Sequence, residues 1–234
     1  MKCIVTAGPT YEELDQVRRM TNFSTGALGS ELANYLVERG HEVVLLRGYY
    51  ATCRIESGAQ TVQVFTTSAD LMRRLQKLRS SKVAAVFHAA AVSDYTFGKI
   101  WRRAAGGKLS EIRLRKISTR GGAVLAEMTP TPKILRRLRG WFPKARLVGW
   151  KYELEGGRAA VIALGERQVA ENSTDACVIN GRAYGAGFGL VEGAGRCRHL
   201  RNKRALFESL AGFAGGLNVA AWLAETSVSD FASG

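Results

Sequence analysis

The stretch of the sequence with the clearest chemical character is residues 18–29, which read RRMTNFSTGALG. Basic side chains come first, Asn22 follows, and a hydroxyl-rich turn leads into an amphipathic pattern typical of a helix. Ser24, Thr25 and Gly26 would lie at the positive start of that helix, where a phosphate binds well. An ordinary helix cap with a turn glycine explains the same residues. Anion binding is favoured because other ligand-type loops are predicted at the same edge.

The position of this turn is unusual for a nucleotide-binding fold. About fifteen residues separate it from the strand predicted at 3–7, whereas the glycines of a dinucleotide fingerprint follow their strand directly. The second predicted strand, 42–47, ends in Arg47 rather than in the acid that binds a ribose. A standard NAD site is therefore disfavoured, although an arginine suits the extra phosphate of NADP.

Apolar β-branched runs alternate with helical patterns along the chain. Several runs are continuous rather than alternating, which is typical of strands covered on both faces of a parallel sheet. The pattern predicts a Rossmann-like, doubly wound α/β fold with a mainly parallel sheet and right-handed crossovers. The predicted strands are 3–7, 42–47, 61–65, 83–91, 145–150 and 176–180, and the predicted helices are 27–39, 68–79, 131–139 and 158–171.

Two glycine-rich segments interrupt this alternation. Residues 94–123 surround the strand-like run EIRLRKI and predict a flap, and residues 181–199 predict a hairpin after the last strand. The chain has no internal repeat and no long low-complexity tract. We therefore expect a single domain over residues 1–234, extended by the flap and the hairpin.

Ligands of an open parallel sheet bind beyond the carboxyl ends of its strands. This rule gathers TAGPT (6–10), HAAAVSD (88–94), GWKYE (149–153) and Asn180 at one edge. The small side chains of the alanine run would let a ligand approach the backbone closely. His88, at the start of that run, is expected to pack or to form a local hydrogen bond.

Composition narrows the class of protein. The chain has 234 residues, 46% of them hydrophobic, and a formal net charge of +14. Nucleic acid, an anionic membrane or a polyanionic substrate would suit that charge, but a solvated surface explains most of it. The four cysteines show no CxxC spacing, the start of the chain lacks a secretory signal, and the most apolar run, 210–225, contains glycines. We expect a cytoplasmic protein that spans no membrane.

Two features suggest other functions. Tyr95 and Lys99 spell the YxxxK pair of short-chain reductases, but a Phe-Gly pair between them argues against the required helix. Residues 136–147, RRLRGWFPKARL, set basic side chains beside aromatic ones, and binding of nucleic acid there would depend strongly on salt. An NADP-dependent reductase and a basic nucleic-acid-binding module are the alternatives, and we expect no nucleic-acid partner because no known binding motif accompanies the charge.

Taken in order, the motifs resemble those of phosphopantothenoylcysteine synthetases (phosphopantothenate–cysteine ligases). TAGPTYEELDQVRRMTNFSTGALG is similar to the opening of that family, and HAAAVSDY to its second signature. Lys116-Ile-Ser-Thr resembles the lysine motif of the family's flap, and PKARLVGWKYELE resembles a strand motif, with Trp150 where Phe is usual. The resemblance covers nearly the whole chain and implies a stand-alone synthetase, without the flavin-dependent decarboxylase domain that precedes many bacterial members.

The resemblance implies a two-step ligation in coenzyme A biosynthesis. With Mg²⁺, the carboxylate of 4′-phosphopantothenate attacks the α-phosphate of CTP or ATP and releases pyrophosphate. The amine of L-cysteine then attacks the acyl-nucleotidylate. Because two polyanions must meet, cationic and amide donors matter more than an acid or a base. The substrates supply both nucleophiles, so no catalytic triad is needed.

The same resemblance implies roles for individual residues. Asn22 would hold the acyl intermediate and Lys116 would neutralise the triphosphate, which makes these two the expected catalytic residues, although a solvated charge also explains Lys116. The long connection after the first strand would deliver Arg18 and Asn22 across the crevice. The expected substrate-binding residues are Arg18, Ser24, Thr25, Gly26, Ala90 and Ala91. The expected nucleotide-binding residues are Gly8, Asp94, Lys116, Pro132, Ile134 and Trp150. Apolar packing explains Ile134 equally well, and Mg²⁺ would be held mainly by the triphosphate.

Departures from the bacterial pattern leave the nucleotide open. Predicted helix 158–171 carries no lysine, and KISTRGG replaces a KxKK pattern. Both features lean toward the ATP-using, eukaryotic-like branch, whereas the chain as a whole leans slightly toward CTP. Arg120 or Arg167 can substitute electrostatically. Family members pair with the flap of one subunit at its partner's site, so the resemblance implies a homodimer.

Overall fold

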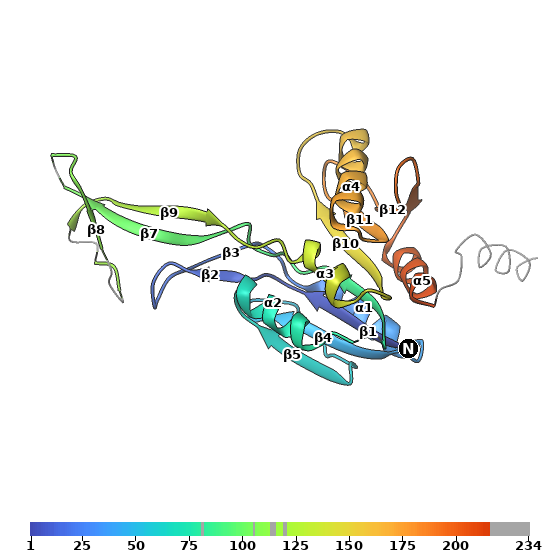
Figure 1. Cartoon of the computed structure of the whole chain (residues 1–234). Coiled ribbons are helices and arrows are strands. Elements are labelled where there is room, and N and C mark those ends of the chain that lie inside the picture. Colours follow the sequence, from blue (N-terminus) through green and yellow to red (C-terminus); the bar gives the residue numbers. More distant parts are fainter. Residues whose placement is uncertain (81, 105, 113–115, 119–120, 216–234) are drawn as a thin grey trace, which may run out of the picture.

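The computed structural model describes residues 1–80, 82–104, 106–112, 116–118 and 121–215, which form an α/β body with a long arm (Figure 1). The strands of the body are β1 (Lys2–Ala7), β4 (Glu42–Gly48), β5 (Thr61–Phe65), β6 (Val83–His88), β10 (Arg146–Tyr152), β11 (Ala176–Asn180), β12 (Phe188–Val191) and β13 (Cys197–Leu200). They form one eight-stranded sheet in the order β13-β12-β11-β10-β6-β1-β4-β5. Neighbours from β11 to β5 are parallel, whereas β12 and β13 pair antiparallel at the other edge.

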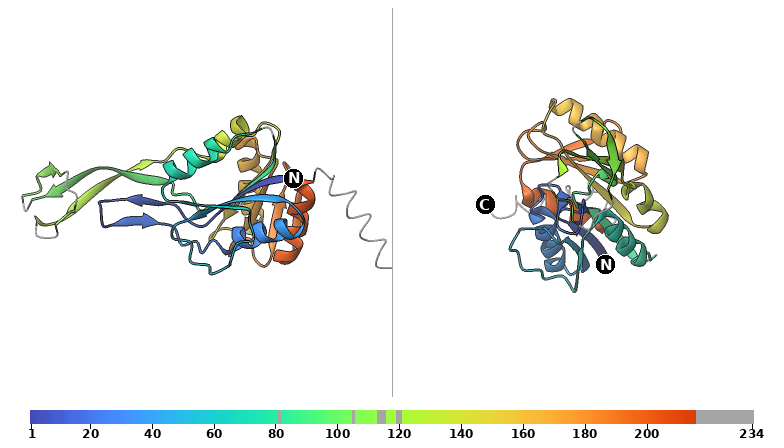
Figure 2. Two further views of the ribbon diagram at one scale, coloured as in Figure 1. Left: turned by 90° about the horizontal axis from the view of Figure 1, so that it is seen from below. Right: turned by 90° about the vertical axis from the view of Figure 1, so that its left-hand side faces the viewer.

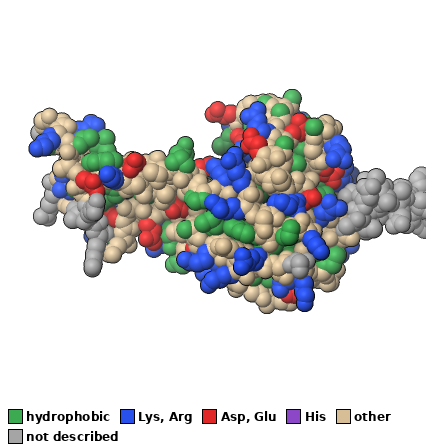
Figure 3. Space-filling model, in the orientation of Figure 1, with side chains coloured by type: hydrophobic (Ala, Val, Ile, Leu, Met, Phe, Trp, Pro, Cys, Tyr) green, Lys and Arg blue, Asp and Glu red, His purple; other side chains and the backbone are tan. Residues whose placement is uncertain are grey.

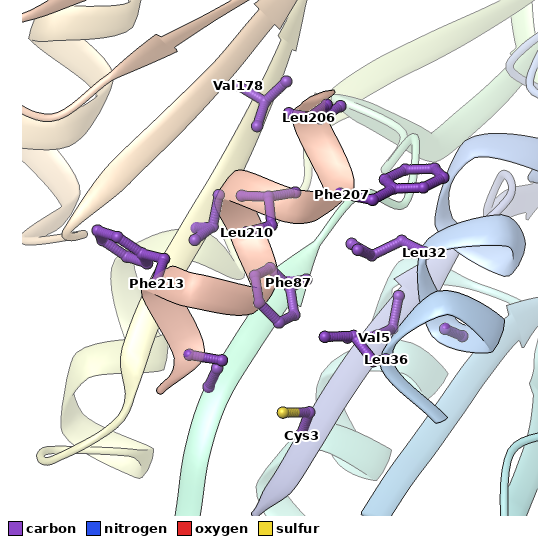
Figure 4. Packing of buried hydrophobic residues seen from close by; sticks show 14 of the residues in the cluster. Cys3, Val5, Leu32, Leu36, Phe87, Val178, Leu206, Phe207, Leu210 and Phe213 are labelled. Atoms are coloured by element: carbon purple, nitrogen blue, oxygen red, sulfur yellow. The ribbon is translucent and has the colours of Figure 1, made fainter. Parts of the chain in front are cut away.

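Helices cover both faces of this sheet. Helices α1 (Ala27–Glu38) and α5 (Lys203–Ala214) pack on one face, and α2 (Ser68–Lys77), α3 (Leu135–Trp141) and α4 (Arg158–Asn172) pack on the other. Successive strand residues point to opposite faces, so Val5 lies in the core under α1 and α5 while Ile4 lies under α2 and α3. Figure 4 shows Leu206, Leu210 and Phe213 of α5 directed at the first of these cores.

The arm projects from the carboxyl edge of the sheet. It is a three-stranded antiparallel sheet of β7 (Tyr95–Arg103), β8 (Leu109–Glu111) and β9 (Val124–Pro130), with β7 in the middle. A short hairpin of β2 (Tyr11–Glu13) and β3 (Arg19–Thr21) extends in the same direction, and β2 contacts β7 (Figure 2). The long connection noted in the sequence is therefore this hairpin.

The structure confirms the predicted fold class, with differences at the edges of elements. The strand predicted at 83–91 ends at His88, and the helix predicted at 131–139 begins only at Leu135, so Pro132 does not open it. The backbone at Thr131 is held instead by a hydrogen bond from its amide to the Asp94 carbonyl. Predicted segments 94–123 and 181–199 contain antiparallel strands, and parts of EIRLRKI and of 210–225 lie outside the described residues.

Candidate active site

Two loops at the carboxyl edge of the sheet run side by side. After β1, the chain passes through Gly8 and Pro9, and after β6 it passes through Ala90 and Ala91. The Ala91 amide donates to the Gly8 carbonyl at 3.0 Å, and the Thr10 amide donates back to the Ala91 carbonyl at 3.1 Å. TAGPT and HAAAVSD, which are far apart in the sequence, therefore form one short parallel pairing at the predicted ligand edge.

The β2–β3 hairpin returns Asn22 to this edge. Antiparallel pairing sets Tyr11 opposite Thr21, and the Thr21 hydroxyl donates to the Thr10 carbonyl at 2.8 Å. The exposed side-chain amide of Asn22 then donates to the Ala91 carbonyl at 3.3 Å. Asn22 thus reaches the alanine loop through a hairpin that the sequence analysis did not predict.

Residues 24–26 lie beside the same loops, at the start of α1. Gly26 is the residue before the helix, with a φ of 74°. Ser24 is half-buried, and Thr25 is exposed. The Thr25 hydroxyl accepts from the Ala27 amide at 3.3 Å. This geometry serves as an N-terminal turn and also leaves a helix N-terminus at the ligand edge, where negative charge is stabilised.

Position 8 requires glycine because neighbouring residues lie too close for a side chain. Its φ is +84°, and an added Cβ would lie 2.7 Å from the Ala51 Cβ. We expect Gly8→Ala to lower the free energy of unfolding by about 2–4 kcal/mol, combining positive-φ strain with steric overlap. Gly40→Ala is the matched control, because Gly40 has a φ of +77° and open space around it.

Urea denaturation of both glycine variants separates the two causes. Gly40→Ala should lose only about 1–2 kcal/mol, the cost of a left-handed backbone with a side chain. Equal losses in the two variants would mean that Ala51 moves aside freely, and would contradict tight packing at this loop.

His88 supports the alanine loop from below the surface. Its Nδ1 lies 2.9 Å from the Thr6 hydroxyl, and that hydroxyl accepts from the Ala90 amide at 3.0 Å. Burial lowers the pKa of His88 to about 4, so the ring is neutral at physiological pH. The local hydrogen-bonding role predicted for this histidine agrees with the structure.

A buried polar network, which the sequence analysis missed, ties the root of the arm to the β1 loop. The Ser93 amide donates to the Thr10 hydroxyl at 2.8 Å, and the Thr131 hydroxyl donates to the Ser93 carbonyl. Glu12, also buried, accepts from the amide and the hydroxyl of Ser68 at 3.0 and 2.6 Å. The sequence signal that could have indicated this network is the pair of hydroxyl residues Thr10 and Ser93, which follow the glycine and alanine runs.

The remaining predicted residues are spread over several places. Asp94 is exposed and forms an ion pair with Lys133, while Lys116 is exposed on the arm. Pro132 is also exposed. Ile134 is buried in the core under α2 and α3, whereas half-buried Trp150 packs against the core under α1 and α5. The side chains of Ile134 and Trp150 therefore lie on opposite faces of the sheet, and the structure does not bring them together in one base pocket.

A cleft of about 750 Å³ opens beside this edge, between the ends of β10 and β11 and the start of α5. Asn180, expected at the edge from the sequence, lines it. Four cationic side chains that the sequence analysis missed also line it: Arg182, Arg201, Lys203 and Arg204. Figure 3 shows Lys and Arg side chains spread over the body of the protein, with hydrophobic side chains between them. Two of these cations are already paired, Lys203 with Glu31 at 2.7 Å and Arg204 with Glu208 at 3.0 Å, so the positive charge of the cleft is smaller than its four cations suggest.

The fold bears on the two features that suggested other functions. Tyr95 and Lys99 lie on strand β7, not on a helix, so they do not form a reductase pair. In segment 136–147, Arg139 donates to Asp175 at 2.6 Å, and Arg146 approaches the same carboxylate at 3.4 Å. Within the described ranges there is no group of three metal-binding side chains, and no helix there is long and apolar enough to cross a membrane.

The fold and the edge define a class of protein: a doubly wound α/β domain with a helix N-terminus at its carboxyl edge and an antiparallel arm. The family model for the DNA/pantothenate metabolism flavoprotein C-terminal domain matches residues 1–203. The chain belongs to this family.

Relatives of known name agree with this assignment. The chain is 28% identical over 187 residues to the coenzyme A biosynthesis bifunctional protein CoaBC of Thermococcus kodakarensis, covering 79% of this chain and 42% of that protein. The CoaBC protein of Bacillus subtilis gives 28% identity, with 80% and 42% covered. The chain thus spans less than half the length of these curated relatives.

Solved structures share the fold. The DNA/pantothenate metabolism flavoprotein from Streptococcus pneumoniae superposes with a TM-score of 0.78 at 23% identity, covering 92% of this chain and 99% of that one. A Cab2 variant in complex with phosphopantothenate-cysteine gives a TM-score of 0.67 at 19% identity, covering 97% and 88%.

Proposed function

We propose that this protein is a phosphopantothenate–cysteine ligase of coenzyme A biosynthesis that acts in the cytoplasm, with residues 1–234 forming one synthetase domain. The observation that carries the proposal is the convergence of Asn22, the 24–26 turn and the alanine loop at one edge, in a chain of this family. CoaBC relatives act in coenzyme A biosynthesis by name, and a fold neighbour was solved with phosphopantothenate-cysteine. Both support the proposal.

In the first step, a carboxylate oxygen of phosphopantothenate attacks the α-phosphorus of the nucleotide. A P–O bond forms, the bond to pyrophosphate breaks, and an acyl-nucleotidylate results. Asn22 and the amides of Thr25 and Gly26 donate to oxygens that carry developing charge, while Arg18 and Lys116 offset the charge of the phosphates. Pre-positioning of two anionic substrates is the main contribution of the protein.

In the second step, the cysteine amine attacks the acyl carbon. An amide bond forms, the bond to the nucleotide monophosphate breaks, and the amine gives up a proton. The small side chains of Ala90 and Ala91 leave room for the reacting groups beside the backbone. Gly8 and Asp94 on the neighbouring loops contact the nucleotide in this proposal.

The cleft beside Asn180, which Arg182 and Arg201 also line, is our candidate for the rest of the nucleotide. Pro132 and Trp150, the residues expected to contact the base, do not line this cleft, so their part in the proposal is tested only by substitution. Either CTP or ATP fits this proposal, and CTP is slightly preferred. When bound, Mg²⁺ would neutralise charge on the triphosphate. Its ligands would be phosphate oxygens and water molecules, as is usual for this ion at phosphates. Among the predicted site residues, Asp94 is the carboxylate at this edge, and it is already paired with Lys133.

A homodimer completes the proposal. The arm exposes large hydrophobic side chains, among them Leu109, Val124 and Met128 at 48%, 37% and 46% exposure. A second copy of the chain would cover such residues. Sedimentation analysis of the purified protein tests this point.

The reaction itself is tested by pyrophosphate release with phosphopantothenate, cysteine and Mg²⁺, run separately with CTP and ATP. Mass spectrometry should detect phosphopantothenoylcysteine from wild type. Lys116→Gln is expected to lower kcat about 100-fold, because one cation at the transferring phosphates is lost. Lys108→Gln, which removes an exposed charge from the same arm, should stay within about threefold of wild type. Absence of product with both nucleotides would exclude the proposed function.

A further inference from the structure

A buried carboxylate joins the β2–β3 turn to the arm. The Asp15 side chain has 0% exposure although the turn around it faces solvent. Its Oδ1 accepts from the Val17 and Arg18 amides at 2.9 and 2.8 Å. Its Oδ2 accepts from the Ile117 amide, 102 residues further along the chain, at 3.1 Å. Three amide donors compensate for burial of the charge, which is otherwise unfavourable.

Arg18 completes the same junction from the other side. Its guanidinium donates to the Ile117 carbonyl at 2.6 Å, and its Nε lies 3.7 Å from Asp15 Oδ2. Both backbone polar groups of Ile117 are therefore used, and the residue as a whole is only 3% exposed. The Ile117 amide is the main cause that holds the pKa of Asp15 below its ordinary value, and the Val17 and Arg18 amides act in the same direction.

The junction fixes the backbone beside two cationic residues. Lys116 directly precedes the held residue, and Arg18 contacts it, so both are fixed to one short piece of backbone. The Asp15 carboxylate, 3.7 Å from the Arg18 guanidinium, offsets part of that charge before any substrate binds. Asp15 is the anion that the structure places there.

We infer that Asp15 is a positioning residue that holds Lys116 and Arg18 in register for the phosphates of the substrates. The inference rests on the proposed function, in which these two cations act on phosphates. Asp15 itself is too buried to contact a ligand, so it acts through Ile117 and Arg18. Without it, the arm would reach the site only after substrate had bound, and turnover would fall.

Asp15→Asn tests the inference, because it keeps the size of the side chain and removes the charge and one acceptor. Exchange of the Ile117 amide, followed by nuclear magnetic resonance, should speed up about tenfold or more, and kcat should fall about tenfold. In a Lys116→Gln background the same substitution should cost less than about twofold, since residues that act through one another are not additive.

Asp175→Asn is the matched control. Asp175 accepts from the Leu147 amide at 2.8 Å and from Arg139 at 2.6 Å, next to the amino end of β11 and away from the ligand edge. It should lower stability while leaving kcat and Ile117 exchange unchanged. The inference is overturned if Asp15→Asn behaves like this control. It is also overturned if Asp15→Asn lowers kcat as much in the Lys116→Gln background as it does in wild type. If wild type makes no product, the proposed function fails, and Ile117 exchange alone decides whether Asp15 holds the arm.

Discussion

An Asn22→Asp variant is expected to lose about 100-fold or more in kcat for pyrophosphate release while remaining folded. The substitution replaces an amide donor by a carboxylate that faces the Ala91 carbonyl, now 3.3 Å from the Asn22 nitrogen. Two oxygens then repel each other, and the new charge also repels two anionic substrates. Loss of a single donor to developing charge costs about 10²–10³-fold in well-studied enzymes.

The control for this variant is Asn34→Asp. Asn34 makes the same kind of bond, from its side-chain amide to the Glu56 carbonyl at 2.8 Å, but it lies on the middle of α1. Its replacement should leave kcat within about threefold of wild type. Pyrophosphate release and thermal unfolding of both variants are the measurements. Near-normal turnover by Asn22→Asp would remove Asn22 from the proposed chemistry.

A second large effect is expected on stability in mild acid. His88 is neutral and buried in the folded protein, where burial lowers its pKa from 6.5 to about 4. The unfolded chain takes up a proton near pH 6.5 and the folded chain does not, so the unfolded state gains as the pH falls. The contribution of His88 to the free energy of unfolding is therefore at its maximum above pH 6.5, and it falls by about 3 kcal/mol between pH 6.5 and 4.

Urea denaturation at half-unit steps of pH measures this loss. His88→Gln, which keeps a polar partner for the Thr6 hydroxyl, should remove most of the slope between pH 6.5 and 4. His41 contributes in the same direction, because burial also lowers its pKa. Asp70, whose pKa is lowered by Arg74 and Arg73 despite partial burial, loses its contribution only below about pH 4. An unchanged slope in His88→Gln would assign the acid sensitivity elsewhere.

Much of the fold was predictable because its signals are local. The continuous apolar runs at β1, β4 and β6 reflect burial on both faces, and the Thr67 side chain caps α2 by accepting from the Asp70 amide, as a threonine before a helix predicts. Strand β2 was missed because three residues show no period, and β9 because a strand on an exposed arm lacks an apolar run.

The candidate site divides in the same way. The strand-end rule placed the TAGPT loop beside the alanine loop, because parallel strands end at one edge whatever else the chain does. The contact of Asp15 with Ile117 and the separation of Ile134 from Trp150 had no local signal. Both depend on which distant segments pack against each other.

The sequence by itself determined the parallel sheet, its carboxyl edge and the residue types available there, since strand period and loop composition are properties of neighbouring residues. Only the tertiary structure decided that a hairpin carries Asn22 back to Ala91, that four cations line a cleft at α5, and that a buried carboxylate ties the arm to the turn. The physical reason is that burial and hydrogen bonds between segments about a hundred residues apart come from long-range packing, which no window of sequence contains.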